Sequence, residues 1–230
     1  MLVIGDFHDT DFKSVNKAPK IYVVTPYYKE SLEVLRRCHD SVLGQQEANC
    51  DITHVMVADG FARPEIDDWG VAHVKLPSAH GDNGNTPRAL GAMLAQAEGA
   101  YFIAYLDADN WFYPSHLASM LERHQETRAQ VVCCMREFYD PSGQKIAVTE
   151  SDEDALRHVD TSCLLIHRSA FATNSLWMMP RQLSPICDRI FFKGVVHSRY
   201  HLAFTQKRTV GFTTLYVSHY NAVAGPCRQG

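Results

Sequence analysis

The sequence lacks long hydrophobic runs: no stretch approaches the roughly eighteen consecutive apolar residues that a membrane-spanning helix needs. The opening residues MLVIGD carry no basic segment, so we expect no signal peptide. Basic residues are not in excess either, since 22 Lys and Arg stand against 26 Asp and Glu, a net charge of −4. Proteins that neutralise nucleic-acid phosphates are usually basic. We therefore expect no membrane span and no nucleic-acid partner, although the composition permits peripheral membrane association.

The sequence also lacks the cysteine spacings that mark metal clusters or disulfide frameworks. Its seven cysteines are odd in number and show no CxxC pair. We interpret them as reduced thiols of a cytoplasmic protein. With 46% hydrophobic and 21% charged residues, the chain has ordinary globular composition, which excludes disorder as a description of the whole. Its length predicts a single domain over residues 21–230, preceded by an N-terminal arm or extra strand over residues 1–20.

What the sequence does contain is an alternation of apolar strands and amphipathic helices. Strands are predicted at 21–24, 52–57, 71–76 and 101–106, with helices between them beginning near Leu32 and before Leu90. Farther along, the pattern predicts a helix from Pro114 to about Arg128, a strand at 131–135, a hairpin turn at Gly143, a strand at 161–166, a helix at 188–201 and a strand at 209–217. This alternation predicts an α/β fold with a mostly parallel central sheet and helices on both faces. Ligands of such folds bind at the carboxyl ends of the strands.

Two carboxylates, Asp107 and Asp109, follow the buried strand 101–106 directly. Such a DxD pair offers the hard oxygen ligands that Mg²⁺ or Mn²⁺ prefers, and it leaves other metal positions free for substrate phosphates. The alternative is an ordinary turn, because Asp and Asn are common after strands. The apolar strand before the pair and the WFYP segment after it favour the metal-binding interpretation.

Four segments occur in a characteristic order: VTPYY at 24–28, VADG at 57–60, NTPRALG at 85–91 and LDADNWFYP at 106–114. Taken together, they resemble the family 2 glycosyltransferases of the GT-A fold, and the resemblance extends over about residues 21–220. It implies a GT-A type, Rossmann-like three-layer α/β/α sandwich. Residues 21–113 would bind the nucleotide sugar, and residues 114–230 would bind the acceptor.

The resemblance also implies a function. A sugar would pass with inversion from a nucleotide sugar, with a UDP-sugar favoured, to a hydroxyl acceptor in polysaccharide or glycoconjugate synthesis. The implied cofactor is Mn²⁺ or Mg²⁺, and a homodimer is compatible with the resemblance. The residues implied to bind the nucleotide sugar are Thr25, Pro26, Tyr27, Asp59, Arg88, Asp107, Ala108 and Asp109.

Among these residues the resemblance implies distinct roles. Thr25 and Tyr27 would line the base and ribose, Asp59 would accept a hydrogen bond from the uracil, and Arg88 would lie near the base and diphosphate. Asp109 would bind the metal most directly, with Asp107 as its partner. The structural alternatives are a strand-end turn for Thr25 and Asp59 and a surface charge for Arg88. The sequence departs from the family pattern where Ala58 and Asn110 replace acids that are common at those positions.

Transfer to a hydroxyl group also requires a base that accepts the proton of the acceptor. The segment SPICDRIFFK at 184–193 resembles the family segment in which an acid opens a helix near the acceptor, so Asp188 is the predicted catalytic base. Cys187 stands where Glu is common. The alternative role of Asp188 is to stabilise the start of that helix. The segment LYVSHYN at 215–221 resembles the closing Y-x-x-H segment of the family, which implies that His219 is the third metal ligand or a diphosphate contact. The alternative is an ordinary strand-end histidine.

Other functions fit the sequence less well. A sugar-phosphate nucleotidyltransferase would need a glycine-rich phosphate loop after the first strand, and TPYYK at 25–29 contains no glycine. A dinucleotide-dependent dehydrogenase would need G-x-G-x-x-G at the same place. A non-catalytic sugar-nucleotide-binding or scaffold protein stays open as an alternative. Donor hydrolysis measured with and without Mn²⁺ would separate that alternative from an enzyme.

Overall fold

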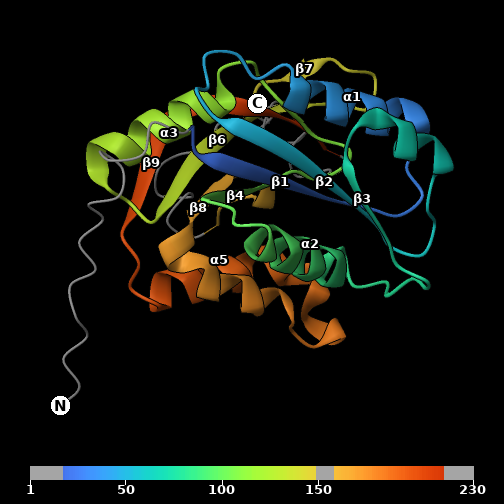
Figure 1. Ribbon diagram of the computed structural model, residues 1–230. Coiled ribbons are helices and arrows are strands. Elements are labelled where there is room, and N and C mark those ends of the chain that lie inside the picture. Colours follow the sequence, from blue (N-terminus) through green and yellow to red (C-terminus); the bar gives the residue numbers. More distant parts are fainter. Residues whose placement is uncertain (1–17, 149–157, 215–230) are drawn as a thin grey trace, which may run out of the picture.

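The computed structural model describes residues 18–148 and 158–214, which form a nine-stranded sheet with helices on both faces (Figure 1). Helices α1 and α3 cover one face, and α2 and α5 cover the other. The strands are β1 Lys20–Tyr27, β2 Asp51–Ala58, β3 Ala72–Lys75, β4 Phe102–Tyr105, β5 Trp111–Phe112, β6 Val131–Tyr139, β7 Lys145–Ile146, β8 Leu164–His167 and β9 Leu202–Thr213. The α-helices are α1 Leu32–Leu43, α2 Asn85–Ala97, α3 His116–Thr127 and α5 Cys187–His197, and 3-10 helices cover Pro64–Trp69, Thr161–Cys163, Arg168–Trp177 and Arg181–Ile186. The predicted fold class is confirmed.

The order of the strands explains where a ligand site can form. The sheet runs β3-β2-β1-β4-β8-β6-β9-β5, with β7 paired to β6. Its first four strands are mutually parallel, so the carboxyl ends of β1, β2 and β4 meet at one edge. The rest of the sheet is mixed, because β8 runs antiparallel to both β4 and β6, whereas β6 and β9 are parallel.

The central strands form because their side chains are buried on both faces of the sheet. Residues Ile21–Val24 of β1 and all of β4 are buried and mostly apolar, the pattern of a parallel sheet covered on both sides. Helix α1 begins where the hydroxyl of Ser31 accepts a hydrogen bond from the Val34 N–H at 3.3 Å. Between β1 and α1 lies the loop that carries Glu30.

Several predicted boundaries need correction in the second half of the chain. The strand predicted at 161–166 starts as the 3-10 helix Thr161–Cys163, because the Asp160 carboxylate caps it by accepting the Ser162 N–H at 2.9 Å. The last strand begins at Leu202, seven residues before the predicted start, because β9 pairs in parallel along nearly all of β6. The register of that pair shifts between Cys133 and Arg136, a bulge that periodicity does not reveal.

Within residues 18–148 and 158–214, no helix has both the length and the apolar character to cross a membrane. The arm predicted over residues 1–20 lies largely outside the described residues, and β1 itself begins at Lys20.

Close packing of α2 on the sheet depends on Gly91. A Cβ built at this position would lie 2.5 Å from Cγ1 of Val24 and 3.1 Å from Cγ2 of Val57. Both valines are fully buried and their side chains are stiff, so neither can move aside cheaply. Glycine therefore lets the helix that carries Arg88 lie directly on β1.

We predict that Gly91→Ala lowers the free energy of unfolding by about 1–3 kcal/mol, despite the better helix propensity of alanine. The measurement is urea denaturation. Gly194→Ala in α5 is the matched control, because its Cβ would meet the end of the half-buried Leu176 side chain at 2.5 Å, which can rotate away. Equal stability of Gly91→Ala and the wild-type protein would contradict this account of the packing.

Candidate functional site

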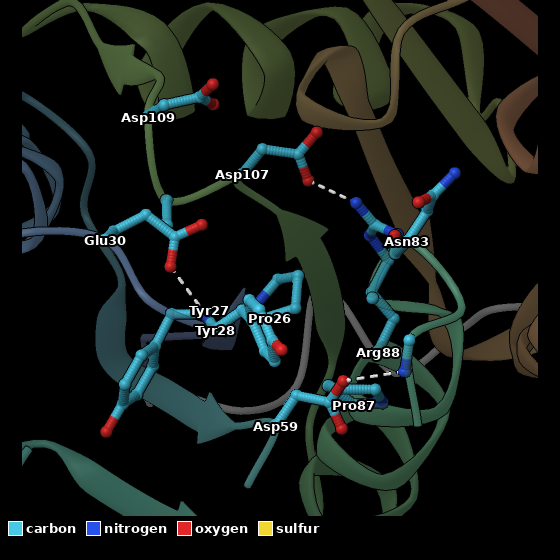
Figure 2. A pocket seen from close by; sticks show the side chains of 13 residues that line it. Pro26, Tyr27, Tyr28, Glu30, Asp59, Asn83, Pro87, Arg88, Asp107 and Asp109 are labelled. Carbon is cyan, nitrogen blue, oxygen red and sulfur yellow. Dashed lines mark hydrogen bonds and ion pairs between the residues drawn. The ribbon is translucent and has the colours of Figure 1, made fainter. Parts of the chain in front are cut away.

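A pocket of about 440 Å³ opens at the carboxyl ends of β1, β2 and β4 (Figure 2). The loop before α2 and the first turns of that helix form its other wall. Seven of the predicted site residues line it: Pro26, Tyr27, Asp59, Arg88, Asp107, Ala108 and Asp109. The structure therefore brings together residues that lie 83 positions apart in the chain.

Thr25 is not among the lining residues, and its place beside the base and ribose stays a prediction. Its side chain is completely buried, and its hydroxyl lies 2.9 Å from Nε2 of His54. The hydroxyl also lies 3.8 Å from Sγ of Cys38 in α1, so the Thr25 side chain is enclosed between the sheet and α1. The next two residues of β1, Pro26 and Tyr27, reach the pocket instead.

Arg88 and Asp107 form an ion pair on the pocket wall. The Nη2 group of Arg88 donates to Oδ1 of Asp107 at 2.5 Å, and Nη1 donates to the carbonyl of Asn83 at 2.7 Å. Arg88 is buried, with a 6% exposed side chain, and its guanidinium lies 5.1 Å from the centre of the Trp177 ring. Burial opposes the charge of Arg88, but the Asp107 carboxylate outweighs this effect and raises the pKa of the guanidinium. The pair thus places a permanent positive charge beside the carboxyl end of β4.

Asp109 points into the pocket apart from this ion pair (Figure 2). Its backbone carbonyl accepts hydrogen bonds from Nη2 of Arg37 at 2.7 Å and from the hydroxyl of Thr213 at 3.3 Å, which fix the turn after β4. Partial desolvation and then the charge of Asp107 raise the pKa of Asp109 to about 7, although the residue is open to the pocket. A cation between the two carboxylates would relieve this repulsion.

The donor set fits a divalent ion that shares its coordination with a substrate. Among residues 18–148 and 158–214, no three His, Cys, Asp or Glu side chains gather in an arrangement that could hold a metal. Asp107 and Asp109 would therefore need further oxygen ligands, and Mg²⁺ commonly takes these from water and phosphate. His219, the predicted third ligand, lies outside the described residues.

Asp59 anchors the loop that closes one side of the pocket. Its carboxylate accepts hydrogen bonds from the backbone N–H of His80 at 3.0 Å, from that of Gly81 at 3.3 Å, and from the His80 ring at 2.7 Å. Next to it, Gly60 has a φ of +81°, and a Cβ there would lie 2.4 Å from the backbone nitrogen of Ala79. A residue with a side chain would push this loop away from the sheet. The buried Asp59 is thus a structural residue as well as a lining residue.

Tyr27 is held by a chain of hydrogen bonds behind the pocket. Its hydroxyl oxygen accepts the N–H of Arg63 at 3.0 Å, so the hydroxyl proton points to Nε2 of His73 at 2.7 Å. The opposite ring nitrogen of His73 then donates to Asp67 at 2.7 Å. Lys75 and His73 lower the pKa of the Asp67 carboxylate and keep it an acceptor. This chain fixes the orientation of the Tyr27 ring at the pocket wall.

Asp188, the predicted base, lies in the first turn of α5 and does not line the pocket itself. Burial raises the pKa of Asp107, and the charges of Asp160 and Asp188 add to this effect. The Asp188 carboxylate accepts a hydrogen bond from Nε2 of His158 and from the N–H of Arg189 at 2.7 Å. Burial would raise the pKa of Asp188, but His158 outweighs burial and the pKa is lowered. The carboxylate is therefore ionised at neutral pH, as a general base must be.

Six lining residues were not predicted from the sequence: Tyr28, Glu30, Gly81, Asn83, Gly84 and Pro87. Glu30 accepts the N–H of Tyr28 at 2.6 Å and faces the pocket from the β1–α1 loop (Figure 2). The sequence signal for three of these residues is the glycine- and asparagine-rich run GDNGN at 81–85, which is typical of a tight loop. Gly84 has a φ of +80°, and a Cβ there would press on Pro26 and Arg88. Only the structure shows that this loop forms a wall of the pocket.

Comparison with known proteins now identifies the family. The model of glycosyl transferase family 2 matches residues 22–184, more than two thirds of the chain. The chain therefore belongs to glycosyl transferase family 2. A search of curated proteins found no match.

Several solved structures share the fold of this chain. The crystal structure of Staphylococcus aureus TarS 1–349 has a TM-score of 0.69 at 14% identity and covers 84% of this chain and 60% of that one. The same TarS fragment in complex with UDP gives 0.67 at 15% identity, with coverages of 89% and 63%. In complex with UDP-GlcNAc it gives 0.68 at 14% identity, with coverages of 88% and 61%. The present chain thus spans less than two thirds of the length of these fragments, and the likeness at this identity concerns the fold.

We predict that Asp59→Ala releases the loop that its carboxylate holds. Amide hydrogen exchange at His80 and Gly81 should accelerate about ten- to hundredfold in the ligand-free protein, because a hydrogen bond to a charged group contributes about 1.5–3 kcal/mol. Asp68→Ala removes the same charge from an exposed position and serves as the control. Unchanged exchange at His80 and Gly81 in Asp59→Ala would contradict the anchoring role.

Proposed function

We propose that this protein transfers a sugar from a nucleotide sugar to a hydroxyl group of an acceptor, with inversion at the sugar carbon. The observation that carries the proposal is the pocket in which Asp59, Arg88, Asp107 and Asp109 meet at the carboxyl ends of parallel strands, in a chain of glycosyl transferase family 2. Ligands of α/β sheets bind at this edge.

The donor that we favour is a UDP-sugar. The volume of about 440 Å³ suits a nucleotide, since pockets for small ligands and cofactors span about 300–1,000 Å³. The loop anchored by Asp59 and the ring of Tyr27 form the side that we assign to the base and ribose. Arg88 provides positive charge for the diphosphate. Support for uridine comes from TarS, which has been crystallised with UDP and with UDP-GlcNAc.

Asp107 and Asp109 are the residues that would hold a divalent ion, either Mn²⁺ or Mg²⁺. The ion would supply positive charge where the diphosphate leaves the sugar. The raised pKa of Asp109 supports this assignment, because burial, and after it repulsion from Asp107, disfavour the ionised carboxylate in the absence of a nearby cation. Oδ1 of Asp107 accepts the hydrogen bond from Arg88, so Oδ2 is the oxygen of Asp107 that would bind the ion.

Asp188 is our candidate for the base. In the proposed step, the acceptor oxygen forms a bond to the sugar carbon and gives its proton to the Asp188 carboxylate. The bond from the sugar carbon to the phosphate oxygen breaks, and its electron pair leaves with the nucleoside diphosphate. The lowered pKa of Asp188 supports this role, because His158 outweighs the effect of burial and keeps the carboxylate ionised.

A measurement of donor hydrolysis separates the proposed enzyme from a protein that binds sugar nucleotides without catalysis. UDP-, GDP- and TDP-sugars are incubated with the full chain, with and without Mn²⁺, and the release of nucleoside diphosphate is measured. The proposal predicts catalytic release from one donor class, with water as the acceptor. Saturable binding without release from any donor would favour the non-catalytic protein.

We predict that Asp109→Ala abolishes the Mn²⁺-dependent part of stabilisation by a nucleoside diphosphate. In the wild-type protein, UDP at tenfold excess over its dissociation constant should stabilise the fold by about 1.4 kcal/mol, measured as a thermal shift. Asp51→Ala is the control, because Asp51 is exposed at the opposite end of β2. Equal Mn²⁺-dependent shifts in Asp109→Ala and wild type would remove the metal assignment.

We predict that Asp188→Asn leaves the affinity for UDP and Mn²⁺ nearly intact and lowers turnover by about 10²–10⁴-fold, the range for loss of a general base. A residue that merely stabilises the start of α5 would instead change stability by about 1 kcal/mol and leave turnover largely unchanged. Binding is measured by calorimetry, and turnover by release of nucleoside diphosphate. A variant with wild-type turnover, or one that fails to bind UDP, would overturn the assignment of Asp188.

A further inference from the structure

The hydrogen bond between His158 and Asp188 joins the candidate base to a second, distant segment of the chain. Nε2 of His158 meets Oδ2 of Asp188, and their side chains are 25% and 30% exposed. The other carboxylate oxygen, Oδ1, accepts the N–H of Arg189 within α5. His158 therefore holds one carboxylate oxygen from outside the helix, while the helix itself holds the other.

The segment that carries His158 is rigidly anchored in the core. Two residues farther on, Asp160 forms a buried ion pair with Arg136 of β6, with Nη1 and Oδ2 2.6 Å apart. Ser162 follows, and its hydroxyl accepts the N–H of Asp107 at 3.1 Å. The short segment of residues 158–162 thus contacts both the carboxylate of Asp188 and the backbone of Asp107.

We propose that His158 is a positioning residue for the base: its Nε2–H bond holds Oδ2 of Asp188 outside the helix, directed at the acceptor, while Oδ1 stays bonded to the N-terminus of α5. The inference rests on the proposed function. An aspartate in the first turn of a helix is attracted by the free N–H groups there, so a second donor is needed to hold its other oxygen elsewhere. His158 keeps its own proton during transfer, and the proton of the acceptor passes to Asp188.

The charges around Asp188 give the proposal a second consequence. Burial acts against the ionised carboxylate of Asp188, whereas His158 and Arg189 favour it. The charge of Asp188 in turn adds to the effect of burial, which raises the pKa of Asp107, in the turn after β4, and of Cys187. Removal of His158 should therefore raise the pKa of Asp188. Because a base works only in its ionised form, the acid limb of the pH dependence of kcat should then move to higher pH.

The test compares His158→Gln with His158→Asn. The amide nitrogen of glutamine can reach the place of the histidine Nε2 and donate to Asp188, whereas that of asparagine is too short to do so. With the preferred UDP-sugar and Mn²⁺, His158→Asn should lower kcat about tenfold to hundredfold, the scale of a displaced catalytic group, with KM within about twofold. It should also shift the acid limb upward. His158→Gln should recover most of the rate at pH 8.

A His158→Asn protein with wild-type kcat and pH profile would overturn the inference and leave the proposed function intact. So would equal losses in both variants, because the rescue would then be absent. No turnover in the wild-type protein would instead overturn the proposed function, and this inference with it. Should His158→Asn fail to fold, NMR of the His158 ring decides: its Nε2 resonance should move in Asp188→Asn relative to wild type, and an unchanged resonance would contradict the pairing.

Discussion

The ion pair between Arg88 and Asp107 is the interaction on which the candidate site depends. A guanidinium this deeply buried would be very costly without a partner, so the fold must bring a carboxylate to it in good geometry. Arg88 comes from the first turns of α2 and Asp107 from the end of β4. The pair therefore fixes the helix relative to the sheet, and the absence of a side chain at Gly91 allows the close approach that this requires.

The loop between β3 and α2 contacts both the parallel strands and the segment before α5. On one side, the backbone N–H of His80 in this loop donates a hydrogen bond to the carboxylate of Asp59, which directly follows β2. On the other, the carbonyl of Gly81 accepts Nε of Arg181 at 3.0 Å, and Nδ2 of Asn83 donates to the carbonyl of Ser184 at 3.0 Å. Ser184 lies in the 3-10 helix that leads directly into α5 and Asp188. The same loop thus contacts the Asp59 side of the pocket and the segment that precedes the candidate base.

The sequence was sufficient to predict the fold class and most of the pocket, because both depend on local patterns. Buried parallel strands appear as continuous apolar runs, and polar residues just after them converge at one edge of the sheet. This logic located Asp59, Asp107 and Asp109 in the pocket, but it did not reveal that the Thr25 side chain is enclosed by His54 and by Cys38 of α1. Glu30 and His158 were missed because their places depend on a loop conformation and on a contact across 30 residues. No periodicity encodes either feature.

The central claim, that this pocket binds the nucleotide part of the donor, is tested most directly by NMR mapping of the binding site. Amide resonances of the labelled full chain are followed while UDP is added in the presence of Mg²⁺. The account predicts saturable shifts centred on Tyr27, Asp59, Gly81, Arg88 and Asp107, with amides of β7 and of the far end of α3 unchanged. Shifts centred elsewhere, or no shifts with UDP, GDP or TDP at millimolar concentration, would contradict it.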